Sequence, residues 1–289
     1  MLRALKQIRA AASRLTPSEI VEQAVRPLAV ALVASSNAGH AEMEDFLLSG
    51  DMPAGRRMEL LKFLHRNGES QNPEKFDLVL CEQGLPCPVH AFTYFRDDPE
   101  RTVNEILQER DDLALALARH FTPFRKPVVD RMIHAVAREN AMFAVVTALP
   151  NIVPSLIELP WAVGEFASDT AFLTINQIRM AFLIAAASGK EIGFLEQKGQ
   201  IATIIGGAFG WRALARELVG KIPLGGGLIP KGAIAYAGTY VVGKSLEHLQ
   251  RHGRGYSRPE RQDAFDNAFD KGKAVVEVLL GALKKRSLA

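Results

Sequence analysis

The segment of this sequence with the clearest chemical meaning runs from Ala34 to Ala41 and has the placement of a phosphate-binding loop. It follows an apolar run of strand length, Leu28 to Val33, and precedes a stretch with helical spacing. A working loop of this kind reads GxxxxGK[ST], with a lysine for the β- and γ-phosphates and a hydroxyl for Mg²⁺. Here the second glycine, Gly39, is kept, but His40 replaces the lysine and Ala41 replaces the hydroxyl. Because phosphoryl transfer depends on the charge that these two groups supply, this loop cannot support ordinary nucleotide hydrolysis.

The next apolar run, Phe76 to Cys81, points the same way. A GTPase has Asp-x-x-Gly after this strand, whereas this chain has Cys81-Glu82-Gln83-Gly84, and no Asn-Lys-x-Asp motif for the guanine base occurs. Three interpretations stay open: a generic βα unit that never bound nucleotide, a degenerate GTPase-like domain, and an active NTPase with unusual ligands. We favour the degenerate domain over the generic unit, and the active enzyme least. In the degenerate domain Gly39 and the helix after it could still hold a phosphate through backbone N–H groups.

Polar residues set into apolar helices form a second group with chemical potential. They are Asp169, Asn176, Gln177, Arg179, Arg212, Arg216, Lys221 and Lys231. If buried, such groups must find partners, because desolvation is costly. We expect Asp169 to pair with an arginine, and Asn176 or Gln177 to pair with a freed backbone carbonyl. The favoured interpretation is a structural network that specifies how the helices pack. The alternative is a ligand or lipid-headgroup site made by Arg212, Arg216 and Lys221.

The segment from Lys221 to Lys231 is predicted to be the apex of a helical hairpin. Its two prolines and three glycines prevent a continuous helix, and its flanking lysines would keep both ends in water or at lipid headgroups. Small residues also recur at helical spacing nearby, where they let helix backbones approach closely, in lipid or in a soluble bundle. They are Gly206 with Gly210, and Ala235, Thr239 and Gly243.

Other catalytic and metal-binding arrangements are missing from the sequence. It contains no GxSxG, no HExxH and no EF-hand loop. Asp130 and His134 lie one helical turn apart, but solvated helix contacts are their expected use. Cys81 and Cys87 fit neither a CxxC redox pair nor a zinc knuckle. We therefore expect two thiols in a reducing cytoplasm, no cofactor and no metal.

Elements of two kinds must position these residues. From Arg26 to about Phe121 the pattern is α/β, with strands at 28–33, 76–81 and 89–95, a helix at 41–48, and a long helix from Asp98 toward His120. After Thr122 the strand-like runs give way to alanine- and leucine-rich helical segments. These are predicted at 125–148, 154–167, 169–188, 192–219, 229–251 and 258–285.

None of these helices is a confident membrane span. A spanning helix needs about 20 mainly apolar residues, and the longest charge-free run, Asn140 to Ile157, is interrupted by Pro150 and Pro154. A compact bundle is favoured, and a bundle or hairpin embedded in one membrane face is the alternative. The first fifteen residues form a short cationic amphipathic helix, which packs on the protein itself or contacts a membrane surface.

Three groups of motifs in the helical half resemble a known domain. They are Asp169 to Met180, Gly210-Trp211-Arg212 with Arg216, and Lys221-Ile222-Pro223 with Gly238 to Lys244. Across roughly residues 140–253 the chain resembles the helical domain of unknown function often fused behind bacterial Era-like GTPase domains, which also occurs in a family described as inner-membrane proteins. The resemblance implies a helical module that works beside a GTPase-like domain, often at a membrane. It implies no catalytic residues, and the loop at 34–41 argues against carrying over GTPase activity.

The sequence therefore predicts an α/β plus all-α chain. Residues 1–24 would hold the cationic helix and a second short helix, 25–122 a small degenerate Rossmann-like or P-loop-like domain, and 123–289 a mostly helical domain of the GTPase-associated type. We expect a non-enzymatic protein, cytoplasmic and peripheral to or partly embedded in the inner membrane, that binds a membrane surface or a GTPase partner. The alternative is a switch that binds GTP without hydrolysing it. A net charge of +3 without a basic run among aromatic residues argues against nucleic acid.

Overall fold

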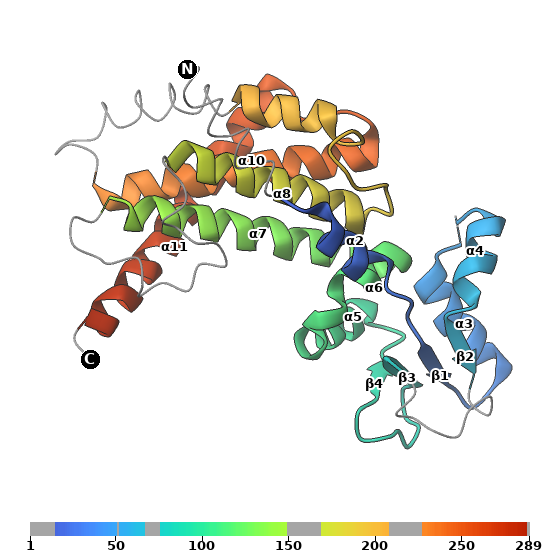
Figure 1. The fold of residues 1–289 in the computed structure, drawn as a ribbon. Helices are drawn as coiled ribbons and strands as arrows, with labels where there is room; N and C mark the ends of the chain where they lie inside the picture. The colour runs from blue at the N-terminus through green and yellow to red at the C-terminus, as the bar shows by residue number, and fades with distance from the viewer. Residues whose placement is uncertain (1–14, 51, 67–75, 149–168, 208–226, 288–289) are drawn as a thin grey trace. The chain divides into compact units, whose positions relative to one another are not determined.

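The computed structural model describes residues 15–50, 52–66, 76–148, 169–207 and 227–287 of this chain (Figure 1). They form two compact units. The α/β unit contains residues 18–130 and 186–190, and the helical unit contains the other described residues. The chain is mostly helical and has one small parallel sheet, which confirms the predicted combination of an α/β part with helices.

The sheet of the α/β unit has four parallel strands in the order β2-β1-β3-β4. The central strands β1 (Val30–Val33) and β3 (Leu78–Glu82) are almost wholly buried, as their continuous apolar runs predict. The edge strand β4 (Phe92–Tyr94) lies within the third predicted run. The other edge strand, β2 (Leu64–Arg66), was not predicted, because it is three residues long, half-exposed and mostly polar.

The helices of the α/β unit differ from prediction at three places: the helix predicted at 41–48 begins at residue 37, a helix over residues 54–61 was not predicted, and the long helix after Asp98 is broken. The predicted long helix from Asp98 to His120 is wrong, because it is broken at Arg110, whose φ of −121° and ψ of 53° lie outside the helical region. The Arg110 guanidinium turns back to the Asp112 carboxylate and to the backbone carbonyl of Asp77. The helices are α2 (Pro17–Val25), α3 (Asn37–Leu48), α4 (Ala54–Leu61), α5 (Pro99–Glu109), the short 3-10 helix η2 (Asp111–Leu113) and α6 (Ala114–His120).

The helical unit contains most of α7 (Thr122–Val146), α8 (Asp169–Ala187), a helix over residues 198–207, α10 (Leu228–His252) and α11 (Arg258–Ser287). The predicted helix at 154–167 lies outside the described residues. The predicted helix at 192–219 begins later than expected, since residues 193–197 form bends and turns. Its part beyond residue 207 also lies outside the described residues.

Glycines set the closest helix contacts of this unit, in agreement with the small-residue spacings of the sequence. A Cβ on Gly272 of α11 would come within 3.0 Å of the Ala233 carbonyl oxygen of α10, so the two backbones nearly touch. A Cβ on Gly243 of α10 would come within 2.8 Å of Ile133 of α7 and 3.0 Å of Met180 of α8. Glycine at these two positions therefore lets the helices pack at short range.

In the described part of the chain, one helical stretch, Thr170–Ala187, is long and apolar enough to cross a membrane, and 78% of it is buried within the protein. A core helix of a bundle passes the same test of length and composition. The polar contacts of α8 described below place it as a core helix of this unit.

Candidate functional site

The loop after β1 lies where an open parallel sheet usually binds ligands. The chain passes from β1 to β2 on one side and returns to β3 on the other side of β1, so the strand order reverses between β1 and β3. Ligands of such sheets bind at the carboxyl ends of the strands at this point. Val33 and Cys81 are paired near these ends, which brings residues 34–36 next to Glu82.

Ser36 begins α3 and uses its side chain as a helix cap. Its backbone is extended, with φ −148° and ψ 162°, and its hydroxyl accepts a hydrogen bond from the Gly39 backbone N–H at 3.1 Å. The His40 side chain is buried, and its Nδ1 lies 2.9 Å from the Ser36 carbonyl oxygen, to which it donates. The residue in the lysine position therefore turns back onto its own helix.

Glu82, the last residue of β3, takes up the donors of the loop. Its Oε2 accepts hydrogen bonds from the backbone N–H of Ser35 at 2.8 Å and from the Ser35 hydroxyl at 2.8 Å. A Cβ built on Gly39 would come within 3.0 Å of the same oxygen, so the carboxylate also lies against the first turn of α3. A carboxylate of the protein thus satisfies the backbone and side-chain donors at the start of this loop.

The surroundings keep this carboxylate charged. The Ser35 backbone N–H and then the Ser35 hydroxyl lower the pKa of Glu82 below its usual value, and the positive charge of Arg96 adds to the effect. Glu82 is therefore anionic at neutral pH.

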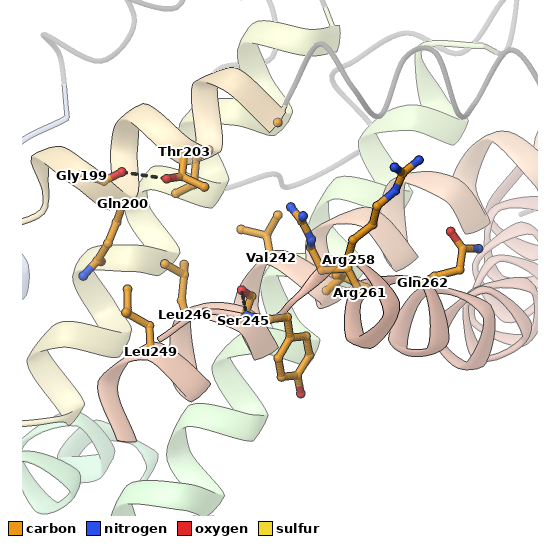
Figure 2. A pocket seen from close by; sticks show the side chains of 15 residues that line it. Gly199, Gln200, Thr203, Val242, Ser245, Leu246, Leu249, Arg258, Arg261 and Gln262 are labelled. Atoms are coloured by element: carbon orange, nitrogen blue, oxygen red, sulfur yellow. Dashed lines mark hydrogen bonds between the residues drawn. The ribbon is translucent and has the colours of Figure 1, made fainter. Parts of the chain in front are cut away.

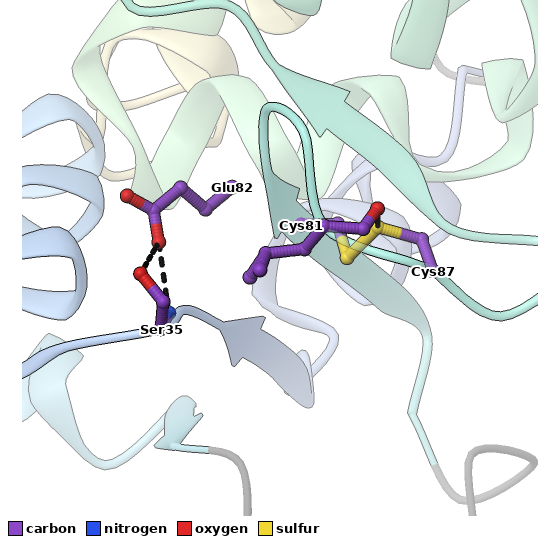
Figure 3. Close-up of a disulfide and its surroundings, with 5 residues drawn as sticks. Ser35, Cys81, Glu82 and Cys87 are labelled. Atoms are coloured by element: carbon purple, nitrogen blue, oxygen red, sulfur yellow. Dashed lines mark hydrogen bonds between the residues drawn. A yellow bond between two sulfur atoms is a disulfide. The ribbon is translucent and has the colours of Figure 1, made fainter.

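A disulfide closes the loop that follows β3. Cys81, fully buried in the strand, is joined to the exposed Cys87, whose Cα lies 6.2 Å away (Figure 3). The expectation of two free thiols is thus wrong. The chain doubles back through a turn at Gly84, where φ is +92°, and this turn brings together two cysteines whose sequence spacing matches no redox or zinc motif. The disulfide holds both ends of the segment that begins with Glu82.

The predicted polar residues of α8 are joined to neighbouring helices in a buried network. Asn176 donates to Asn140 Oδ1 and to Glu139 Oε2, each at 3.0 Å. Thr239 Oγ1 of α10 accepts from Asn140 at 2.8 Å and from Gln177 at 3.2 Å. The expectation that Asn176 or Gln177 would pair with a freed backbone carbonyl is wrong. Their amide groups donate instead to side-chain oxygens of α7 and α10 that lie beside them.

The other predicted positions are placed as follows. Arg179 forms an ion pair with Glu139 at 3.5 Å and so extends the network. Lys231 lies away from it, where its Nζ contacts Thr147 Oγ1 at 3.4 Å. Asp169 is the first residue of α8, and its side chain lies outside the described part. The remaining three, Arg212, Arg216 and Lys221, lie outside the described residues, as does most of the predicted hairpin apex.

Several residues of the Glu82–Ser35 contact and of the polar network were not predicted from the sequence. Glu82 was noticed as a departure from a GTPase motif, but its contact with Ser35 depends on the pairing of β1 with β3. Glu139 and Asn140 follow Arg138 in a polar run of α7, and Thr239 was noticed only as a small residue at helical spacing, so nothing in the sequence indicated that they would meet Asn176 and Gln177. Only the packing of α7, α8 and α10 shows which of them meet.

The described residues hold no cluster of three or more His, Cys, Asp or Glu side chains suited to a metal ion. Asp130 pairs with Lys126 at 3.0 Å, and His134 contacts the Tyr236 hydroxyl at 2.7 Å. The two residues of the possible metal pair thus have other partners. Compared with known proteins, the chain matches no family model, no curated protein and no solved structure.

Proposed function

We propose that this protein is a non-enzymatic binding protein whose α/β unit is a degenerate phosphate-loop domain of the Rossmann-like, GTPase-like type. The observation that carries the proposal is the hydrogen bonding of Glu82 to both donors of Ser35. A strand, a loop and a helix follow one another as in a nucleotide-binding domain, but the anion position is taken by the protein's own carboxylate.

Electrostatics explains why a nucleotide would bind poorly here. A phosphate that approached Ser35 and Gly39 would meet the negative charge of Glu82, and two like charges at short range repel each other. It would also find no lysine and no Mg²⁺ ligand, because His40 bonds to Ser36 and Ala41 has no polar side chain. The loop then serves to fix the shape of the α/β unit.

The binding role rests on the helical half. Its resemblance to a domain that accompanies GTPases at membranes supports attachment to a membrane surface, with a GTPase partner as the other candidate. The cationic first fifteen residues, with Arg3, Lys6, Arg9 and Arg14, supply charge that an anionic surface would attract. The membrane surface is the version that we favour.

Nucleotide binding tests the first half of the proposal. Calorimetric titration of the wild-type protein with GTP, GDP and ATP, with and without Mg²⁺, should give no binding at micromolar concentrations. Glu82→Gln keeps the shape of the side chain and removes its charge, so it should bind phosphate or nucleotide more tightly than the wild type does. Micromolar binding of GTP by the wild type would instead support the second candidate, a switch that binds GTP without hydrolysis, and GTP turnover would overturn both.

Sedimentation with vesicles tests the second half. The full chain should pellet with phosphatidylglycerol vesicles and not with phosphatidylcholine vesicles, and a chain without its first fifteen residues should pellet less. If both forms stay in the supernatant with both lipids, the membrane version is wrong and a protein partner takes its place.

A further inference from the structure

The helical unit contains a cavity of about 630 Å³ that neither the phosphate-loop position nor the polar network uses (Figure 2). It lies between the helix of residues 198–207, the C-terminal half of α10, and the start of α11. Small-molecule sites in proteins typically measure about 300–1,000 Å³. The cavity is therefore large enough for a ligand of that class.

Part of the cavity wall is hydrocarbon, and the rest is polar, including Gln200, Tyr256 and Gln262. The facing helices contribute Ile204 on one side and aliphatic side chains of α10 on the other. The α10 residues are Val241, Val242, Leu246 and Leu249.

Two of the hydroxyls in the wall, those of Thr203 and Ser245, have hydrogen-bond partners within the protein. Thr203 donates to the Gly199 carbonyl at 2.9 Å, and Ser245 accepts from the Tyr256 backbone N–H at 2.9 Å. Gln200 Oε1 is buried without a hydrogen-bond partner in the described part of the chain, so the apolar chain of a ligand would lie along the aliphatic side chains of α10 and Ile204.

Two arginines give one side of the cavity a positive charge. Arg258 and Arg261 lie one turn apart at the start of α11, and both side chains are exposed. Within the described part of the chain, neither guanidinium pairs with a carboxylate. Glu260, between them in sequence, is bound to Arg254 by two hydrogen bonds of 2.9 and 3.1 Å. The N-terminal end of α11 adds the positive end of a helix dipole.

We propose that this cavity binds a fatty acid. The hydrocarbon chain lies between residues 199–207 and α10, and the carboxylate lies at Arg258 and Arg261. A neutral apolar ligand would not use the arginines, and an amphiphilic cation would be repelled by them. A small polar anion would leave the hydrocarbon walls unfilled, so the combination selects a ligand with one anionic end and one apolar chain.

Calorimetry on the full-length protein, freed of bound lipid, tests this assignment. Laurate and dodecyltrimethylammonium have the same chain length and opposite headgroup charge, and both are used below the concentration at which they form micelles. Laurate should bind with a dissociation constant in the micromolar range and at least about tenfold more tightly than the cation, since each charge contact contributes up to about a factor of five.

Two variants locate the site, each with a matched control. Arg258→Ala/Arg261→Ala should weaken laurate binding about three- to tenfold and should not weaken binding of the cation. The control Lys271→Ala/Lys273→Ala removes the same charge from a part of α11 away from the cavity, and it should change neither affinity. Thr203→Trp fills the cavity from an exposed position and should abolish binding of laurate. Ala202→Trp adds the same bulk at an exposed neighbour that does not line the cavity, and should leave binding intact.

Three results would overturn the proposal. Equal affinity for laurate and for the cation would show that the arginines do not select the headgroup. Binding of laurate by a folded Thr203→Trp variant would place the ligand elsewhere. Loss of binding to phosphatidylglycerol vesicles in the arginine variant, with laurate affinity unchanged, would assign the arginines to a membrane surface instead of the cavity.

Discussion

The carboxylate of Glu82 lies 2.8 Å from the backbone nitrogen of Ser35 and 2.8 Å from its hydroxyl oxygen, across the carboxyl ends of two neighbouring parallel strands. In a nucleotide-binding domain these donors face a phosphate. Here an internal anion satisfies them, so the loop keeps its geometry without an external ligand. Glu82 therefore ties the start of α3 to the end of β3, and the proposal that the loop binds no nucleotide rests on this contact.

The pH dependence of stability tests the Glu82 contact. Because the folded pKa of Glu82 is lowered from its usual 4.5, the contact stabilises the fold above that pH and is lost as the pH falls through the folded pKa. Glu82→Gln should therefore be less stable than the wild type at pH 7 and differ from it less at pH 3. Urea unfolding of both proteins at the two pH values measures this difference. A constant difference would mean that the charge of Glu82 has no role.

The disulfide between Cys81 and Cys87 should stabilise the α/β unit by about 2 kcal/mol, the value expected from closing so short a loop in the unfolded chain. Adding a phosphine reductant should lower the free energy of unfolding of the wild type by this amount. Cys87→Ser should show the reduced stability with or without reductant. Full alkylation of both cysteines in folded, unreduced protein would contradict the pairing.

His120 should make the protein sensitive to mild acid. Its ring is buried, with its centroid 4.9 Å from that of Phe63, and desolvation lowers its pKa from 6.5 to about 4. The unfolded chain then binds a proton that the folded chain does not, so stability falls as the pH drops from about 6.5 to about 4, by up to about 3 kcal/mol. His120→Leu should flatten urea-unfolding stability across this range. An NMR titration that places the His120 pKa above 6 would contradict the prediction.

Thr239→Val should lower the free energy of unfolding by about 2 kcal/mol. The substitution keeps the side-chain volume but removes the hydroxyl that accepts hydrogen bonds from both Asn140 and Gln177. Thr203→Val, an exposed change in the same unit, should alter stability by less than about 0.5 kcal/mol. Thermal and urea unfolding of the two variants provide the comparison. Equal stabilities would show that the network does not hold the helices together.

Two glycines should respond differently to the same substitution. Gly243→Ala should lower the free energy of unfolding by about 1–3 kcal/mol, because the new Cβ meets side-chain atoms of Ile133 at 2.8 Å. Adding Ile133→Ala should remove that clash, so the two substitutions should be coupled in a double-mutant cycle. Gly272→Ala meets backbone atoms of Ala233 at 3.0 and 3.1 Å, so trimming a side chain should not rescue it. Additive effects at Gly243 and Ile133 would show that their contact is not the cause.

Much of the fold follows from local patterns in the sequence. Continuous apolar runs gave the positions of β1 and β3, and helical spacing gave α7, α8, α10 and α11 nearly to their ends. The short or polar elements could not be predicted from these patterns. β2 has too few apolar residues to stand out, and the break at Arg110 depends on partners at Asp77 and Asp112.

The sequence by itself determined that the loop at 34–41 lacks the lysine and the hydroxyl of a phosphate-binding loop, because residue types alone decide which chemistry is absent. Only the tertiary structure decided which group accepts the hydrogen bonds of Ser35, that the two cysteines join, and which polar groups of α7, α8 and α10 meet. Each of these contacts joins segments whose separation along the chain carries no local signal. Glu82 reaches Ser35 from 47 residues away, and it does so because β1 and β3 pair in parallel and end at the same edge of the sheet.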